Sequence, residues 1–245
     1  MAHRGASSTH PENTIPAFEA AIAVGARILE LDVRLSRDGV PVVMHDPTVE
    51  RTTGGTGGVH ELTAAEIGAL EAGTASLPAA VPRLRDVMDV ASGRAALAIE
   101  IKHVPGEPAF DPTREAIVEA VHRELEATGF EGPVLVISFN PASIDASRAM
   151  APEVPTGLLT TDLVDPDEAL AYAVRGAHAM VLPGTRALNP AGAAFVGRVH
   201  AAGLRVGTWT VDDPAEVRRL LEWGVDAVAS NDPAMAVDVV SSWSA

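Results

Sequence analysis

The sequence contains no cysteine, which excludes disulfide bonds and thiolate chemistry and is compatible with any redox compartment. Aromatic residues make up only 4% of the 245 residues although 47% are hydrophobic, so we expect a core built mainly from Ala, Val, Leu and Ile. No run of about 18 apolar residues is present, so we expect no stable membrane insertion. No basic-then-apolar leader precedes Ala2, which predicts a cytoplasmic protein and leaves secretion of a processed precursor open.

Positive charge is also scarce, because 18 Lys and Arg residues face 33 Asp and Glu residues and the net charge is −15. Such a surface repels polyanions, which argues against nucleic acid or an anionic membrane as the main partner. If the substrate is an anion, a metal ion or a few cationic side chains must make the electrostatic potential positive at the binding site. The length suits one large domain or two small ones, and the oligomeric state is left open.

Six short runs rich in Val, Ile and Leu follow one another from about residue 95, each followed by a polar turn and an amphipathic stretch. They are residues 95–101, 134–137, 156–159, 179–182, 204–208 and 225–229. Continuous apolar runs of this length favour buried parallel strands over half-exposed ones. The chain is therefore predicted to repeat a strand–helix unit.

The predicted helices share a start signal, an Asp or Asn followed by proline, because such a side chain caps a helix and proline suits its first position. The signal occurs at Asp111, Asn140, Asp165, Asn189, Asp213 and Asp232. In the helix after Asp213, Glu216 is predicted to complete a capping box and Gly224 to follow the last turn.

The N-terminal part supplies two further strands, residues 1–3 and 28–33, with a helix over 14–24 between them. Eight strands predict an α/β fold in the form of a closed TIM barrel. Residues 42–45 form a ninth run, but too few residues separate it from the preceding strand for a parallel crossover. A hairpin turn at 38–39 (Asp-Gly) favours an antiparallel return strand over the barrel mouth.

We predict a single barrel domain over residues 1–245, with a small insertion after the second barrel strand. The insertion covers about 46–90 and contains the stretch TTGGTGG and a helix capped by Thr63 and Glu66. A doubly wound open sheet is the alternative fold, but the chain lacks a glycine-rich dinucleotide-binding fingerprint.

Acidic residues interrupt two of the predicted strands. Glu30 and Asp32 are two residues apart in ILELDVR and share one side of the strand, and Glu100 and Lys102 repeat this spacing in LAIEIK. Because an unpaired buried carboxylate is costly, such acids require salt bridges to Arg4 and Lys102 or a bound hard cation. Oxygen ligands favour Mg²⁺ or Ca²⁺, and paired core charges remain the alternative.

Two histidines lie at predicted strand ends, His3 after the first strand and His45 after the return strand. Both can meet above the acids, where a pair of imidazoles can serve as general acid and general base. The other six histidines lack such a setting, and we expect them to be structural or on the surface.

Several motifs along the chain together resemble the glycerophosphodiester phosphodiesterase family. In order from residue 2 to about 234 they are AHRG, PENT, LELDVRLSRDGVPVVMHD, RTTGGTG, AIEIK, SF, TWTVDD and GVDAVASNDP. The ordered set of motifs is specific for the family, although each motif alone is weak evidence. The resemblance implies a TIM barrel, in agreement with the strand count. The last motif ends in SNDP, whereas in the family this motif more usually ends with a threonine. We expect this difference to loosen one loop.

The resemblance implies a role for each candidate site residue. His3 and His45 match the catalytic histidines, and Arg4 matches a phosphate-contacting arginine. The family's divalent-metal ligands match Glu30, Asp32 and Glu100, with Lys102 facing the same site. Trp209 matches an aromatic residue at the substrate end, with plain packing as an equal alternative. Asn13 is expected to brace the first loop, and Asp46 either orients His45 or caps a turn.

The function implied by the resemblance is metal-dependent hydrolysis of glycerophosphodiesters to sn-glycerol 3-phosphate and an alcohol. The partner is then a small-molecule diester and the cofactor Mg²⁺ or Ca²⁺. A non-catalytic barrel that binds phosphodiester headgroups is one alternative, although it does not require both histidines. A related phosphodiesterase of the phospholipase D type is another, but those proteins typically carry disulfide-tied loops. A further barrel metallohydrolase is disfavoured because no His-x-His pair ends a strand.

Overall fold

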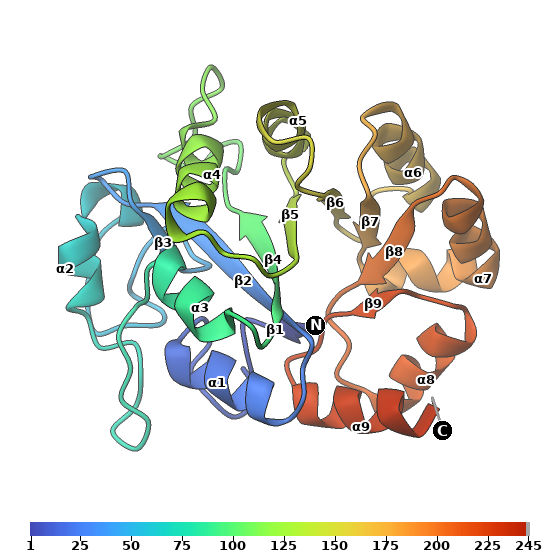
Figure 1. Cartoon of the computed structure of the whole chain (residues 1–245), viewed down its shortest axis with the longest axis horizontal. Helices are drawn as coiled ribbons and strands as arrows, with labels where there is room; N and C mark the ends of the chain where they lie inside the picture. The colour runs from blue at the N-terminus through green and yellow to red at the C-terminus, as the bar shows by residue number, and fades with distance from the viewer. Residues whose placement is uncertain (244–245) are drawn as a thin grey trace.

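Eight parallel strands form the centre of the computed structural model, which describes residues 1–243 (Figure 1). In order around the sheet they are β1(Ala2–His3), β2(Ile28–Leu35), β4(Ala96–Ile101), β5(Val134–Ser138), β6(Thr156–Thr160), β7(Met180–Pro183), β8(Arg205–Thr208) and β9(Ala227–Val228). Backbone bonds between the residues around β1 and Ser230 close the circle: His3 N donates to Ser230 O, and Ser230 N donates to Met1 O. The predicted TIM barrel is confirmed.

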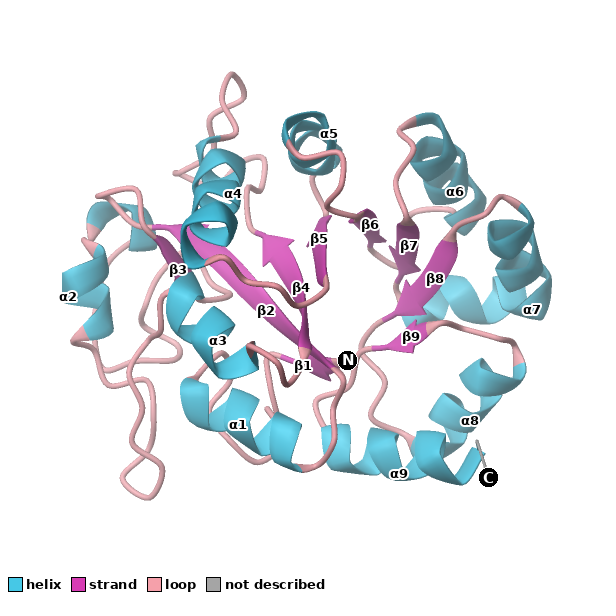
Figure 2. Ribbon diagram, viewed as in Figure 1, coloured by secondary structure: helices cyan, strands magenta, loops and turns pink. Residues whose placement is uncertain are grey.

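Helices surround the strands on the outside (Figure 2). They are α1(Ile15–Ala23), α2(Ala64–Gly68), α3(Leu84–Ala91), α4(Ala116–Thr128), α5(Pro141–Met150), α6(Pro166–Arg175), α7(Thr185–Ala201), α8(Pro214–Glu222) and α9(Pro233–Trp243). The core between strands and helices is mainly aliphatic, as the composition predicts, and Phe18 and Phe195 are its fully buried aromatic residues within 1–243. No helix in that range is long and apolar enough to cross a membrane.

Four of the predicted helix starts are confirmed. Asn140, Asp165 and Asp213 each accept a hydrogen bond from a backbone N–H of the first helical turn, and proline follows each cap. Asp232 does the same for α9 through the N–H of Met235.

The other two predicted starts are wrong. Asp111 accepts bonds from the N–H and hydroxyl of Thr113 and so stabilises a local turn, while α4 begins only at Ala116. Asn189 lies inside α7, which starts directly after β7 and breaks at Gly192, where φ is 59°. The side-chain amide of Asn189 instead donates to Glu216, whose side chain also bonds Arg219. Asp213 accepts from the N–H of Glu216, but the return bond of the capping box predicted for α8 is not formed within the described residues. A polar residue before proline suits a turn as well as a helix start, and the sequence alone does not separate the two.

The return strand β3(Pro41–Val43) pairs antiparallel with β2, as predicted, through a turn in which Gly39 has a φ of 74°. Beyond it, the 3-10 helix η1(Val59–Glu61) and α2 form a small apolar cluster of their own beside the barrel. Helix α3 also falls within the predicted insertion of 46–90, but Leu84 and Val87 pack in the core cluster of the barrel. Helix α3 is therefore part of the barrel wall.

Candidate active site

The predicted site residues gather at the carboxyl ends of the barrel strands, where barrel enzymes carry their chemistry. A cleft of about 200 Å³ opens there, and its wall is partly apolar, from Ile137, Phe139, Leu159 and Leu182. The predicted residues that line it are His3, Arg4, Glu30, His45, Glu100, Lys102 and Trp209. Asp32 is completely buried and lies behind this lining.

The three predicted metal ligands come together. Glu30 and Asp32 share one side of β2, and the parallel register sets Asp32 beside Glu100 of β4. One carboxylate oxygen from each of the three lies within 4.8 Å of the other two. Asp32 also contacts Arg4 Nε at 3.0 Å and Lys102 Nζ at 2.9 Å, and Lys102 pairs with Glu100.

These cations do not balance the cluster. The buried Oε1 of Glu30 has no hydrogen-bond partner within the described residues. Burial, together with the neighbouring carboxylates, raises the pKa of Glu30 and of Glu100 to about 8. Burial would raise the pKa of Asp32 too, but Lys102 and Arg4 hold it well below its usual range. An all-oxygen cluster with an unpartnered buried carboxylate oxygen fits a hard divalent cation such as Mg²⁺ or Ca²⁺.

His3 is held by a chain of hydrogen bonds from the other end of the sequence. Its Nδ1 lies 2.7 Å from Asn231 Oδ1, and the amide nitrogen of Asn231 donates to Asp212 at 2.7 Å. Because this fixes Asn231 Oδ1 as an acceptor, Nδ1 of His3 carries the proton and Nε2 keeps its lone pair. Burial, reinforced by Arg4, lowers the pKa of His3, so the ring is neutral at pH 7.

His45 has a charged partner instead. Its Nδ1 lies 2.7 Å from a carboxylate oxygen of Asp46, which supports the orienting role considered for that residue. A bond from Arg51 lowers the pKa of Asp46 to about 2 and keeps it ionised. Burial and Lys102 lower the pKa of His45, while Asp32 and Asp46 oppose this shift.

An ionic chain runs from His45 to Arg4. Arg51 bonds both Asp46 and Glu12, and Glu12 accepts a bond from Arg4 at 3.0 Å. Arg4 then contacts Asp32, so the two ends of this chain fix the histidine and the carboxylate cluster relative to each other.

The first loop folds tightly around Arg4. A Cβ at Gly5 would lie 2.7 Å from Ala17 of α1, so this approach requires glycine. Asn13 braces the loop as predicted: its N–H donates to Arg4 O, and its side-chain amide donates to Asp32 at 2.8 Å.

Trp209 lines the cleft and is also packed. Its Nε1 donates to Leu182 O at 3.0 Å, and its ring meets Phe139 edge-on with centroids 5.2 Å apart. The indole therefore forms a fixed apolar wall of the cleft.

The other six histidines lie outside this cleft, as expected. His122 pairs with Ser147 between two helices, and His178 lies between Thr156 and Asp145. The remaining four are His10, His60, His103 and His200.

Sequence reasoning missed Asn231 and Asp212, the residues that orient His3. In the loop at SNDP, Asp212 accepts bonds from the hydroxyl of Ser230 and from the N–H of Asn231, and the expected loosening relative to a threonine-bearing loop stays a prediction. Asp212 belongs to the motif TVDD and Asn231 to the motif SNDP, but the spacing of these motifs does not indicate a contact with His3.

The fold and the site thus define a class of protein, a parallel barrel with two imidazoles, two cationic side chains and a buried carboxylate cluster in one cleft at the carboxyl ends of its strands. The family model of the glycerophosphoryl diester phosphodiesterases matches residues 3–235. A glycerophosphodiester phosphodiesterase of Caldanaerobacter subterraneus subsp. tengcongensis is 34% identical over 250 residues, covering 98% of this chain and 96% of its own.

Solved structures of phosphodiesterases have the same fold. A phosphodiesterase of Oleispira antarctica, in complex with the product sn-glycerol-3-phosphate, has a TM-score of 0.88 at 28% identity and covers 98% of this chain and 95% of its own. A glycerophosphodiester phosphodiesterase of Agrobacterium tumefaciens has a TM-score of 0.78 at 29% identity, covering 96% and 97%. The chain belongs to the glycerophosphoryl diester phosphodiesterase family, which confirms the resemblance and the predicted class of enzyme.

Proposed function

We propose that the chain hydrolyses glycerophosphodiesters to sn-glycerol 3-phosphate and an alcohol with a divalent cation bound by Glu30, Asp32 and Glu100. The observation that carries the proposal is the convergence of two imidazoles on this carboxylate cluster, each held through Nδ1 so that Nε2 is left for proton transfer. The product complex of the Oleispira antarctica phosphodiesterase supports the substrate class. A cation bound by the cluster would act as a Lewis acid on the phosphoryl oxygens.

The two histidines differ in their Nδ1 partners, and this difference supports a division of roles. His3 is held by a neutral amide, which adds no charge that would favour a protonated ring, so its free Nε2 suits a general base. His45 is held by the carboxylate of Asp46, which stabilises an added proton and suits a general acid. We assign proton removal to His3 and protonation of the leaving alcohol to His45.

Arg4 and Lys102 complete the proposed site. Both line the cleft beside the cluster, and both keep their positive charge, because neighbouring carboxylates raise the pKa of each against the effect of burial. They would offset charge on the phosphoryl oxygens, a role that strengthens in a cleft with apolar walls. The protein's strong net negative charge makes such local cations necessary for binding an anion.

The nucleophile is proposed to come from the substrate. A glycerol diester carries a hydroxyl next to the phosphate-bearing carbon, and an intramolecular attack gains up to about 7–11 kcal/mol over capture of a second molecule in well-oriented systems. His3 would take the proton of that hydroxyl as its oxygen bonds to phosphorus, and His45 would protonate the alcohol oxygen as it leaves. Water then opens the resulting cyclic phosphate.

Turnover of a panel of glycerophosphodiesters, with released sn-glycerol 3-phosphate as the readout, tests the proposal. Activity that needs an added divalent cation and is lost in both His3→Ala and His45→Ala supports it. A barrel that only binds phosphodiester headgroups is the alternative, and it would bind the same diesters tightly without releasing product from any of them.

A further inference from the structure

Arg34 is a buried arginine that the proposed chemistry does not use; it lines a separate pocket beside the cleft, and Lys102 lines both. It lies two residues beyond Asp32 on β2, on the same side of the strand and closer to the barrel mouth. Only 6% of the residue is exposed. Its guanidinium bonds two partners: Nε donates to the main-chain oxygen of His45 at 2.7 Å, and both Nη atoms donate to Glu107, at 2.6 and 3.1 Å.

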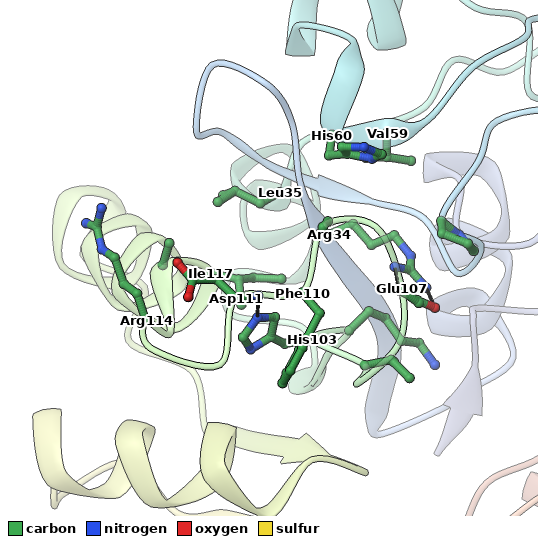
Figure 3. Close-up of a pocket in the computed structure, with 15 residues that line it drawn as sticks. Arg34, Leu35, Val59, His60, His103, Glu107, Phe110, Asp111, Arg114 and Ile117 are labelled. Atoms are coloured by element: carbon green, nitrogen blue, oxygen red, sulfur yellow. Dashed lines mark hydrogen bonds and ion pairs between the residues drawn. The ribbon is translucent and has the colours of Figure 1, made fainter.

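Glu107 belongs to the loop that connects β4 to α4, and Figure 3 shows its side chain directed at Arg34. The loop is fixed at its ends, where His103 pairs with Glu115 and the amide of Asn140 donates to His103 O. Between His103 and Asp111, Glu107 is the one residue with a polar side chain. The Arg34–Glu107 pair therefore ties the middle of the loop to the barrel.

The same pair fixes the direction of the Arg34 side chain. A guanidinium is planar, and two parallel bonds to one carboxylate hold its plane and leave Nε aimed in one direction. Nε donates to the carbonyl oxygen of His45, which lies two residues after the end of β3. The ring of His45 is bonded to Asp46, so the main chain and the ring are each held by one charged side chain.

We propose that Arg34 is a positioning residue for His45 and that Glu107 acts only through Arg34. The proposal rests on the proposed function for its effect on turnover, since His45 must then lie within reach of the leaving oxygen. A shift of about 1 Å in a catalytic group lowers the rate by as much as a hundredfold. Arg34→Met is therefore expected to lower kcat about ten- to a hundredfold with KM changed less than about twofold.

The variants form a double-mutant cycle. Glu107→Gln keeps the size of the side chain but loses the charge, and it is expected to lower kcat by less than Arg34→Met. The double variant is expected to match Arg34→Met, because removal of Glu107 has no further effect once Arg34 is gone. Arg114→Met is the matched control, since Arg114 pairs with Glu119 next to the same loop and has no bond to His45. It should retain the activity of the unchanged protein.

A measurement without substrate separates this proposal from the proposed function. Proton NMR of the Nδ1–H of His45 should show a shifted or broadened signal in Arg34→Met and Glu107→Gln, while the Nδ1–H of His3 stays unchanged. A His45 signal identical to that of the unchanged protein overturns the proposal, as does an additive double variant. If the unchanged protein turns over no glycerophosphodiester, the proposed function fails, and the NMR comparison still decides the role of Arg34. Glu107→Gln supplies the comparison if Arg34→Met does not fold.

Discussion

Asn231→Asp is expected to move the pH dependence of turnover, because it places a carboxylate where a neutral amide now holds His3 at 2.7 Å. An opposite charge at such a distance raises a histidine pKa by about 1–3 units. A general base works only in its neutral form, so the acid limb of the kcat/KM profile should move to higher pH by the same amount. Each unit corresponds to about a tenfold loss of activity on that limb.

The assay is kcat/KM from pH 5 to 9 at saturating cation, for the unchanged protein and Asn231→Asp. The double variant Asn231→Asp with Asp212→Asn is the control, because it restores an amide opposite the new carboxylate and removes the repulsion between two acids. It should show the same displaced limb with recovered activity at high pH. An acid limb that stays in place, or displacement of the alkaline limb instead, would refute the assignment of His3 as the base.

Three further predictions follow from the site and one from the core. Glu30→Ala should abolish divalent-cation binding in calorimetry as well as turnover, and full activity in excess chelator would contradict the metal assignment. His45→Ala should lower turnover by about 10²–10⁴-fold with the fold intact, whereas His200→Ala should leave it near the original rate. A 2-deoxy glycerol analogue should react far more slowly than its parent diester, and phosphorus NMR should detect a cyclic phosphate with the parent only; equal rates would favour direct attack by water. Burial lowers the pKa of His178, so the neutral ring stabilises the folded protein fully above about pH 6.5, and this stabilisation is lost as the pH falls below that value. The unfolding temperature of His178→Gln should therefore depend less on pH between 7 and 5 than that of the unchanged protein.

The strands were predictable because parallel barrel strands are buried on both sides and leave continuous apolar runs. The runs at 134–137 and 156–159 lie inside β5 and β6, and the short hairpin before Pro41 allows only an antiparallel β3. The helix starts were less predictable, since an acidic residue before proline satisfies a turn equally well. Asp111 bonds to Thr113 two residues later, and the helix begins after that turn.

The carboxylate cluster was predictable for the same physical reason. Alternation along a strand places Glu30 and Asp32 on one side, and neighbouring parallel strands align Asp32 with Glu100. The hydrogen-bond partners of the two histidines differ in how far they lie from the histidine in the sequence. Asp46 is the next residue after His45, whereas Asn231 is 228 residues from His3 and meets it only because the barrel closes. No local pattern encodes that contact.

Arg34 illustrates the remaining difficulty. In the stretch LDVRL an arginine two residues after an acid is compatible with a solvated strand end as well as with a buried one. Its guanidinium is paired with Glu107, which lies 73 residues away in the loop after β4. Such contacts follow from the closed fold and cannot be derived from spacing.

The most direct test of the central claim is the release of sn-glycerol 3-phosphate from glycerophosphocholine by the purified protein. The assay compares chelated protein with protein supplied with Mg²⁺, Ca²⁺ or Mn²⁺, and includes His3→Ala and His45→Ala. We predict turnover that depends on the cation and falls by about 10²–10⁴-fold in each histidine variant. Product release that is unaffected by chelation and by both substitutions would contradict the account.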